Sequence, residues 1–532
     1  MKPLVDELRS LDLWQADPLL RERLAALVHD RAELAHYGAL IGSEAAMDWA
    51  EQANRRVPEL QAFDARGRRI DRVDFHPHWH RLLAAIRGSG AIQCPFESGD
   101  WTHSAALFYL HGQVEAGSLC PATMTQAALP VLARHAPTLF DALRGPLLSR
   151  AHDAADRPMA EKQALWLGMG MTEKQGGSDL RSCESRAAPT GQRLHGLPLY
   201  RLDGHKWFFS APMCDAHLVL ARTEEGPSCF FVPRWRLDGH ALNEVRVQRL
   251  KEKLGNRSNS SSEVEFHGSE GLLVGPAGRG IAVLVEMAGY TRLQCVIGST
   301  ALMRAGLVQA IHWCRGRSAF GRLLIDQPLM QQVLADLALE WEAALALMLR
   351  LAHSFGRGET DLVERAWQRV ITPAAKLWVC KRALQFAGEA MEVLGGNGYV
   401  ETGLMGRLYR EAPVNSIWEG SGNVMALDVL RAAEREAEAL QAWFDALLPM
   451  LDATGRQRLL RLRDELRCSD AQAHAHARRI ATELALLAQA ALLDRRSAEA
   501  FVATRLQAPA GMFGAASIEG ARHFVDRAMP AS

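Results

Sequence analysis

The chain has 532 residues, of which 48% are hydrophobic and 23% are charged. These values are typical of a folded globular protein and exclude a disordered or collagen-like chain, and the length predicts three or four structural units. Lys and Arg together number 61, as do Asp and Glu, so no net charge draws the whole molecule to nucleic acid or to an anionic membrane. Any site for a polyanion must therefore be a local patch.

The nine cysteines include no C-x-x-C pair, which argues against a zinc site or a disulfide framework and favours reduced thiols. The first residues lack the uninterrupted apolar stretch of a secretory signal, and no later run is expected to reach the length that spans a bilayer. We therefore expect a cytoplasmic protein that has no membrane segment and no metal site.

Residues 1–167 are predicted to form a helical domain, because apolar residues recur at three- and four-residue spacing, as in Leu19–Ala35. Within it, residues 61–80 (QAFDARGRRIDRVDFHPHWH) are polar and punctuated by Gly and Pro, and are predicted to be a loop. The alternating histidines of this loop lack a nearby Cys or carboxylate triad, so we interpret them as structural rather than as metal ligands: His76, His78 and His80.

Residues 168–275 contain short runs that alternate apolar with polar residues and are separated by turn residues, which predicts a middle β-barrel domain. The GPAGRG segment, Gly275–Gly280, lacks the Lys-Ser/Thr of a phosphate-binding loop and is predicted to be a turn into a helix. Helical periodicity then returns, predicting a helical bundle over residues 276–438 and a C-terminal helical domain over 439–532. The fold is thus expected to be mainly α with a central β-barrel. No G-x-G-x-x-G opens a βαβ unit, so a dinucleotide would need another fold than Rossmann.

The first motif with chemical content is the loop of residues 168–179, GMGMTEKQGGSD. Its hydroxyls, backbone N–H groups and small side chains suit close approach to a flavin ring and a pyrophosphate, although a structural turn would have a similar composition. The phrases MTE and GSD resemble the first signature of the acyl-CoA dehydrogenase superfamily, whose Thr and Ser contact FAD. The resemblance implies cofactor contacts at Met171, Thr172, Gly177 and Ser178.

The second motif is DGHKWFFSAP, residues 203–212. It resembles the family's Gly-x-Lys-x-Trp-x-Thr-Asn pattern, which places an aromatic ring and a hydroxyl beside the isoalloxazine. Phe208 stands at the aromatic position, a departure from Trp, while Trp207 is adjacent and Ser210 stands at the hydroxyl position. Phe209 is expected to be buried in the core of the β domain.

The third motif, RGRSAFGRLLIDQ (residues 315–327), resembles the family's Arg-x-x-Phe-Gly-x-x-Leu run. The resemblance implies that Arg317, with Phe320 beside it, reaches the FAD pyrophosphate of a neighbouring subunit, and a planar guanidinium suits a phosphate better than Lys would. Gln327 comes one position earlier than the family's usual Gln and precedes Pro328, so a cofactor role is not assigned to it.

The fourth motif, EVLGGNGYVET (residues 392–402), resembles the family's Gln-x-x-Gly-Gly-x-Gly-Tyr run. In that family Gly395 and Gly396 would let the backbone pass close to the FAD of the neighbouring subunit. Glu392 occupies the Gln position, and a carboxylate would be repelled by a pyrophosphate. Glu392 is therefore expected to point elsewhere or to pair with an Arg.

The fifth motif lies in RLYREAPVNSIWEGSGNVMALDVLR, residues 407–431. It resembles the segment that carries the catalytic glutamate of medium- and short-chain acyl-CoA dehydrogenases, which implies that Glu419 removes a proton α to a thioester. Apolar neighbours are expected to raise the pKa of this carboxyl toward the working range. Other members carry the base on an earlier helix, just before a family Arg, where this chain has Thr291. The residues around Glu419 implied to contact FAD are Ile417, Trp418, Gly420, Ser421 and Asn423.

These motifs follow one another in the family's order over residues 90–430. Further phrases, among them QVEAGSLCPATMT and KEKLGNRSNSS, together with the C-terminal helical block, resemble the AidB group of alkylation-response flavoproteins within the superfamily. That resemblance implies a homotetramer with FAD, binding of double-stranded DNA, a role in the adaptive response to DNA alkylation, and weak acyl-CoA dehydrogenase activity of the isovaleryl type.

Two hypotheses for the function stay open. One is a dedicated catabolic dehydrogenase of short or branched acyl-CoA; the other is a nucleic-acid-associated flavoprotein that retains the flavin site. The departures at Phe208 and Glu392 and the AidB-like phrases favour the second. A purely structural role would not require a base and a cofactor loop together.

DNA contact is expected in the C-terminal block, where the run TGRQRLLRLRDELR, residues 454–467, has helical periodicity. One face of the expected helix carries cations, and the neighbouring face carries Leu459, Leu462 and Leu466. A solvated surface is the alternative, because Asp464 and Glu465 offset the charge. The candidate phosphate contacts are Arg456, Arg463 and Arg467.

Overall fold

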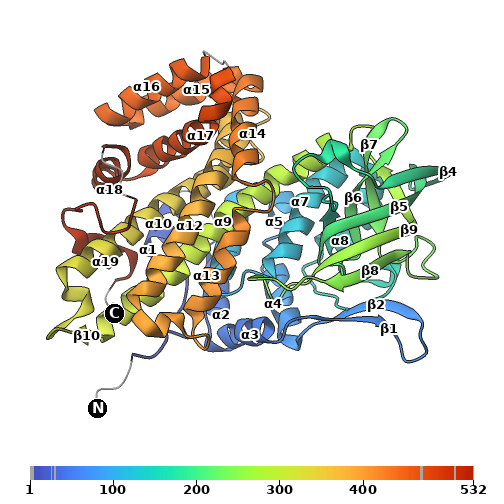
Figure 1. Cartoon of the computed structure of the whole chain (residues 1–532), viewed down its shortest axis with the longest axis horizontal. Helices are drawn as coiled ribbons and strands as arrows, with labels where there is room; N and C mark the ends of the chain where they lie inside the picture. The colour runs from blue at the N-terminus through green and yellow to red at the C-terminus, as the bar shows by residue number, and fades with distance from the viewer. Residues whose placement is uncertain (1–4, 26, 29–30, 468–470, 508–510, 531–532) are drawn as a thin grey trace. The chain divides into compact units, whose positions relative to one another are not determined.

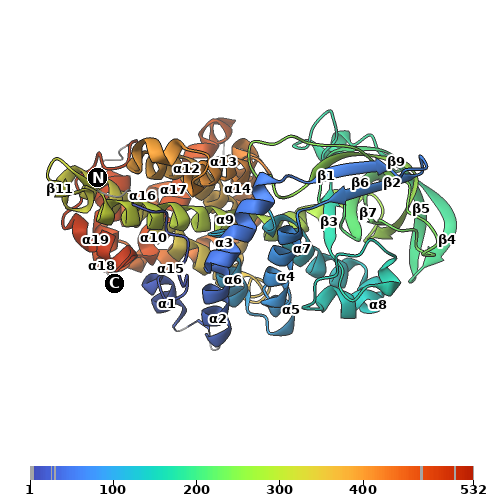
Figure 2. The ribbon, with the colours of Figure 1, turned by 90° about the horizontal axis from the view of Figure 1, so that it is seen from below.

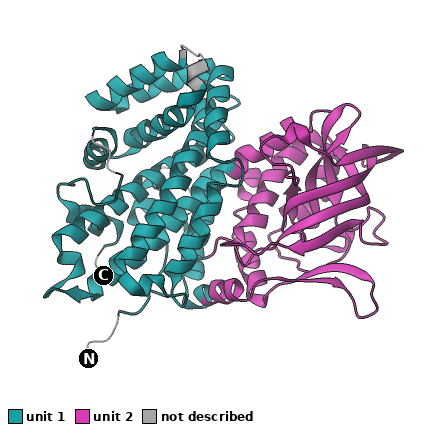
Figure 3. Ribbon diagram, in the orientation of Figure 1, with its two compact units in different colours: residues 1–47, 98–114, 292–532 teal, residues 48–97, 115–291 magenta. Residues whose placement is uncertain are grey.

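The computed structural model describes the chain except residues 1–4, 26, 29–30, 468–470, 508–510 and 531–532, and the side chains of 467 and 471–473. The chain divides into two compact units (Figure 3). Unit 1 comprises residues 1–47, 98–114 and 292–532, and unit 2 comprises residues 48–97 and 115–291. One boundary falls inside α9 (Gly280–Gly316), and the division into four domains stays a prediction.

Unit 2 is built on a seven-stranded sheet (Figure 1). The strand order is β3-β6-β4-β5-β9-β7, with β8 beside β9 and a further pairing of β6 with β7. The inward-facing residues of these strands form a core of unit 2, among them Leu202, Phe209 and Phe266. The predicted central β domain is confirmed, and its strands are β3 (Leu167–Gly170), β4 (Arg186–Leu194), β5 (Leu197–Ser210), β6 (Ala216–Thr223), β7 (Gly226–Pro233), β8 (Val245–Leu250) and β9 (Ser261–Val274).

Among the helices of unit 2, α7 packs against strand β3 of this sheet and against α4 and α8. Pro77 and Pro137 occupy the first turns of α4 and α8, where a missing N–H costs no hydrogen bond. The helical segments of unit 2 are the end of α3 (Glu44–Arg55), α4 (Pro77–Gly88), α5 (Cys94–Glu97), α7 (Leu119–His135), α8 (Pro137–Leu148), η1 (Met159–Glu161) and η2 (Leu180–Ser182).

A β-hairpin occupies most of the segment that was predicted to be a loop, and that prediction is wrong. Strands β1 (Glu59–Phe63) and β2 (Arg69–Asp74) pair antiparallel, as Figure 2 shows. The two strands are only five and six residues long, so they carry little periodic signal; the hairpin is held by long-range bonds such as Arg69 Nη2 to the Val247 carbonyl at 2.7 Å. Of the histidines, His76 caps α4 by accepting from the His78 N–H, and His80 Nδ1 lies 3.2 Å from His152 Nε2.

Unit 1 is a helical bundle around α9, α10 and α12, with the C-terminal helices packed on it: α17 contacts α10, α12 and α14, and α19 contacts α10. The expected helix Leu19–Ala35 is broken into α1 and α2. The remaining elements are α1 (Pro18–Leu24), α2 (Ala32–Ile41), α6 (Trp101–Gly112), β10 (Ser318–Ala319), β11 (Arg322–Leu323), η3 (Leu324–Asp326), α10 (Pro328–Ser354), α11 (Leu362–Ala366), η4 (Trp367–Ile371), α12 (Thr372–Val393), η5 (Gly395–Tyr399), α13 (Leu404–Asn415), α14 (Gly422–Arg435), α15 (Ala437–Leu447), η6 (Leu448–Met450), α16 (Ala453–Arg467), α17 (Ala471–Leu492), α18 (Arg495–Phe501), η7 (Val502–Gln507) and α19 (Ala521–Ala528).

Helix α9 begins directly after the GPAGRG turn, as predicted. By length and composition it is able to cross a membrane, which corrects the expectation that no run is long enough. In the protein, however, 56% of its most apolar window is buried against other residues, which is the packing of a core helix.

Candidate functional site

The glycine-rich loop that follows β3 is attached to β5 in unit 2. The Trp207 N–H donates to the Thr172 carbonyl at 2.8 Å, which brings the first two motifs side by side. A Cβ at Gly177 would lie 2.6 Å from Thr172 Oγ1, so a larger residue would displace that hydroxyl. Gly177 and Ser178 are exposed, which leaves their backbone and hydroxyl groups available to a ligand.

A buried ion pair anchors this loop, and sequence reasoning missed it. The side chains of Lys206 and Glu173 are 0% and 1% exposed, and their charged groups are in contact. Glu173 also accepts from Ser185 Oγ at 2.7 Å and from the Glu184 N–H at 2.7 Å. Burial acts to raise the pKa of Glu173, but the Lys206 ammonium and these donors hold that pKa well below its usual value. Glu173 lies in the MTE motif and Lys206 in the HKW motif. Their presence in two neighbouring motifs was the sequence feature that could have predicted the ion pair.

The aromatic residues of the second motif differ in exposure. Phe209 is 2% exposed in the sheet core, as predicted, whereas Phe208 is 52% exposed. Lys251 Nζ lies 3.9 Å from the ring centroid of Trp207 and 4.5 Å from that of Phe208. Ser210 Oγ lies 3.5 Å from Ser261 Oγ. Phe208 therefore offers an uncovered ring beside a cation.

The third and fourth motifs are surface features of unit 1. Arg317 precedes the β10–β11 hairpin, is exposed, and has no side-chain partner among the described residues. Phe320, at the tip, is 100% exposed with φ of 51°. Gln327 braces the hairpin by donating from Nε2 to the Ala319 carbonyl at 2.9 Å. Glu392 is exposed, and no Arg of the described residues forms an ion pair with it.

Glu419 lies in a tight turn between α13 and α14. It has φ of 59°, a left-handed conformation that is rare for residues other than glycine, and Gly420 follows with φ of 104°. Arg292 Nε donates to the Glu419 carbonyl at 3.2 Å, and Lys376 Nζ donates to the carbonyls of Trp418 and Gly420. Thr291 is buried, and its hydroxyl donates to the Ala288 carbonyl. The role of Glu419 as the base stays a prediction.

The residues after Glu419 begin α14. Ser421 is exposed at the N-cap position, and its side chain makes no capping hydrogen bond. Asn423 Oδ1 accepts from Arg478 Nη1 at 3.3 Å, which leaves its amide N–H groups as donors. Ile417 is 63% exposed.

Each unit by itself carries groups of the kinds that FAD binds. A Cβ placed on Gly396 would meet nothing within 4 Å, so packing of the chain itself does not explain this glycine. Gly395 has a φ of 60°, which by itself favours glycine. A close-lying ligand would explain Gly396, since such a ligand needs backbone without a side chain. Arg317 supplies a free guanidinium for a pyrophosphate, and Phe208 supplies a ring. The residues therefore fit the cofactor that the sequence motifs imply.

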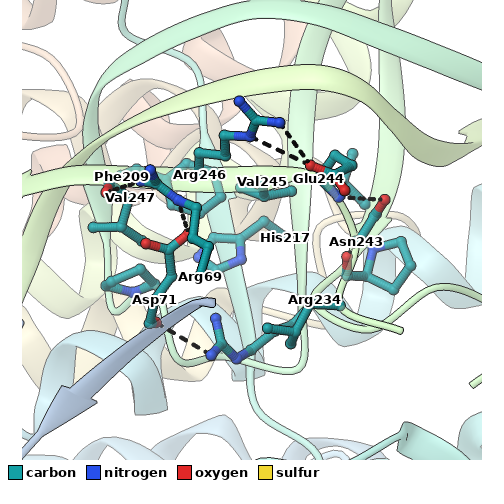
Figure 4. A pocket seen from close by; sticks show the side chains of 14 residues that line it. Arg69, Asp71, Phe209, His217, Arg234, Asn243, Glu244, Val245, Arg246 and Val247 are labelled. Atoms are coloured by element: carbon teal, nitrogen blue, oxygen red, sulfur yellow. Dashed lines mark hydrogen bonds and ion pairs between the residues drawn. The ribbon is translucent and has the colours of Figure 1, made fainter. Parts of the chain in front are cut away.

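A pocket in unit 2 is lined by none of the predicted site residues, although two of its lining residues, Phe209 and His217, adjoin Ser210 (Figure 4). Its charged groups pair with one another: Arg69 Nε lies 2.8 Å from Asp71 Oδ2, and Arg246 Nη2 lies 3.2 Å from Glu244 Oε2. Arg234 Nη2 donates to the Asp71 carbonyl at 3.2 Å. The Arg234 contact, together with that of Arg69 to the Val247 carbonyl, attaches the β1–β2 hairpin to the sheet, which gives the pocket a structural role.

The arginines that were expected to form a cationic face on α16 differ in their exposure to solvent. Leu459 and Leu462 are each 1% exposed, which confirms the apolar face. Arg456 is exposed, but the Arg463 side chain is 25% exposed, and its Nε lies 3.8 Å from Asp464 Oδ1. The side chain of Arg467 lies outside the described part of the chain.

Three family models match the chain in order. They are the adaptive response protein AidB N-terminal domain over residues 4–154, the acyl-CoA dehydrogenase middle domain over 168–269, and the acyl-CoA dehydrogenase C-terminal domain over 278–434. The chain is 50% identical over 408 residues to the putative acyl-CoA dehydrogenase AidB of Escherichia coli K12, covering 76% of this chain and 74% of that protein.

Solved structures show the same fold. Caenorhabditis elegans ACDH-11 in complex with C11-CoA superposes with a TM-score of 0.84 at 26% identity, covering 100% of this chain and 93% of that one. The apo form of Bd2924 superposes with a TM-score of 0.83 at 29% identity, covering 92% of this chain and 100% of that one.

Proposed function

The chain belongs to the acyl-CoA dehydrogenase family, and from this membership we propose that it dehydrogenates a short or branched acyl-CoA, of the isovaleryl type, with Glu419 as the base. It is an FAD-dependent oxidoreductase with an AidB-type N-terminal domain. The observation that carries the proposal is the turn at Glu419, whose left-handed backbone accepts hydrogen bonds from the buried Lys376 and the partly buried Arg292.

The role of each residue in the proposed reaction follows from the chemistry of its side chain. When bound, FAD supplies the acceptor for the β hydrogen, which leaves the substrate as hydride. The Glu419 carboxylate removes the α proton, a task that needs a base within hydrogen-bond reach of that proton. Hydroxyls of Thr172, Ser178 and Ser210 and the guanidinium of Arg317 are the donors that would hold the cofactor.

The proposal is tested by mixing the purified flavoprotein anaerobically with a panel of acyl-CoA thioesters and following flavin absorbance. Bleaching by short branched thioesters supports the assignment, and fast bleaching at low concentration would favour a dedicated catabolic enzyme. If no thioester bleaches the flavin, the proposed reaction is wrong.

We further propose a homotetramer in which Arg317 reaches the FAD of a neighbouring subunit. Phe320, Leu329 and Tyr399 are 100%, 83% and 84% exposed, and exposed apolar side chains of this kind favour an interface. Arg317→Lys is expected to weaken FAD retention without changing the native mass, because a point charge replaces a planar fork.

Gel filtration with light scattering and flavin absorbance measures the mass and the FAD content together. Arg322→Lys, also exposed and on the same hairpin, is the matched control. Equal FAD content in both variants would show that Arg317 does not bind FAD. A monomeric native mass would contradict the proposed tetramer.

A role in the cytoplasmic response to DNA alkylation, with binding of double-stranded DNA, is the second part of the proposal. The AidB N-terminal domain and the 50% identity to AidB support it, as does exposed Arg456 on α16. Because Arg505 forms buried ion pairs with Asp336 and Glu340, deleting the C-terminal block would remove the cation that pairs with Asp336 and leave Glu340 with Arg382 alone. Substitutions in the full chain are therefore the sound test.

The joint substitution of Arg456, Arg463 and Arg467 by Ala is expected to weaken DNA binding evenly across sequences. Each lost phosphate contact reduces the dependence of log affinity on log salt by about one unit. Fluorescence anisotropy over a salt series measures this slope. The same number of exposed arginines replaced elsewhere, Arg66, Arg193 and Arg495, provides the control, and an equal effect of both sets would place the DNA site outside α16.

A further inference from the structure

Three consecutive peptide carbonyls in the turn of Glu419 each accept a hydrogen bond from a cationic side chain. Lys376 Nζ donates to the Trp418 carbonyl at 2.8 Å and also to the Gly420 carbonyl, and Arg292 Nε donates to the Glu419 carbonyl at 3.2 Å. Two helices, α12 and α9, thus hold one turn from two points.

Lys376 stands in the apolar run AAKLWVC of α12 and is only 1% exposed. A buried ammonium is costly unless its donors are satisfied, and such groups normally pair with a carboxylate. Among the described residues, no carboxylate forms an ion pair with Lys376; its partners are the two carbonyls of the turn. Arg292, in contrast, shares its charge with Asp428 Oδ2 at 2.6 Å.

The turn needs such support because its backbone is strained. A left-handed glutamate persists only where the surrounding structure holds it. The N–H groups of Ile417 and Trp418 bond back to the Val414 carbonyl at 2.9 and 3.0 Å, so one side of the turn is tied to α13. The carbonyl side is tied by Lys376 and Arg292.

We propose that Lys376 is a positioning residue for the reaction: its buried ammonium holds the Trp418–Gly420 turn so that Glu419 presents its carboxylate in one orientation. The inference rests on the proposed role of Glu419 as base. Lys376 itself touches neither substrate nor reacting atoms. Its removal is expected to lower kcat while leaving KM little changed, because substrate binding is kept and the placement of the base is lost.

The test compares wild type with Lys376→Met, which keeps the length of the side chain and removes its donors. Hydrogen–deuterium exchange of the peptide covering residues 414–424 reports on the turn and requires no activity. We expect exchange of the Ile417 and Trp418 amides to quicken at least about tenfold, since two hydrogen bonds to a charged donor are lost. Peptides of unit 2 should exchange as in wild type.

Lys162→Met is the matched control. It removes another buried lysine, 4% exposed at its side chain and 2.7 Å from Asp215 in unit 2, without touching the turn. Lys162→Met should lower the unfolding temperature. Its hydrogen–deuterium exchange at residues 414–424 and its kcat should equal those of wild type.

Wild-type exchange at the turn in Lys376→Met would overturn the proposal, as would an increase spread equally over both units. A change in KM alone, with kcat kept, would also overturn it. If Lys376→Met does not fold, Lys376→Gln takes its place: its shorter amide must still quicken exchange at the turn, and wild-type exchange would refute the role. If neither wild type nor any variant dehydrogenates acyl-CoA, the proposed function fails, while the exchange result still decides whether Lys376 holds the turn.

Discussion

Glu419→Gln is expected to retain FAD and to slow flavin bleaching by acyl-CoA at least about a hundredfold, the usual scale for a positioned general base. Gln keeps the shape of the side chain and its place in the left-handed turn, but it has no basic oxygen. Anaerobic stopped-flow absorbance measures the rate, and the flavin spectrum measures the cofactor content.

Glu392→Gln makes the same chemical change at an exposed position and restores the residue that the related motif has there. It should leave the rate near that of wild type. If Glu419→Gln bleaches as fast as Glu392→Gln, the base lies elsewhere.

Lys206→Met is expected to lower the stability of unit 2 by about 3–5 kcal/mol, because it leaves the Glu173 carboxylate buried without its ammonium partner. The loop of Thr172 should loosen with it, so FAD content should fall as well. Urea unfolding followed by fluorescence, together with flavin absorbance of the purified protein, measures both effects.

The double variant Lys206→Met/Glu173→Gln removes both charges and should recover part of the loss, which separates the ion pair from simple loss of packing. The dependence on pH has a definite sign. The pKa of Glu173 is depressed in the folded protein, so the carboxylate stabilises the fold at pH values above its ordinary pKa of 4.5 and progressively less as pH falls below it. The advantage of wild type over the double variant should therefore shrink in acid; a constant difference would contradict the role given to Glu173.

Much of the architecture could be predicted from local patterns. Period-two alternation with turn residues between the runs located the strands of residues 168–275, and helical periodicity located α9 after the Gly275–Gly280 turn. These patterns work because one face of each element must be buried. The family resemblance of the motifs implied roles for Glu419 and Arg317, and these roles stay predictions.

The hairpin of residues 59–74 shows where such patterns stop. Its strands are short, and it is held by Arg69 on the carbonyl of Val247 and by Arg234 on the carbonyl of Asp71, contacts between residues 178 and 163 positions apart. The local sequence does not reveal hydrogen-bond partners that lie so far away along the chain. The segment was therefore predicted to be a loop.

The sequence by itself determined the fold class and the family, since these follow from local periodicity and from the resemblance of several motifs in order. Only the tertiary structure decided that Lys206 and Lys376 are buried and which groups they serve. A lysine within an apolar run is equally compatible with a solvent-exposed position, where its charge is hydrated. It becomes an anchor only where the fold places a buried carboxylate or turn carbonyls around its ammonium, as Glu173 does for Lys206 and the Trp418–Gly420 turn does for Lys376.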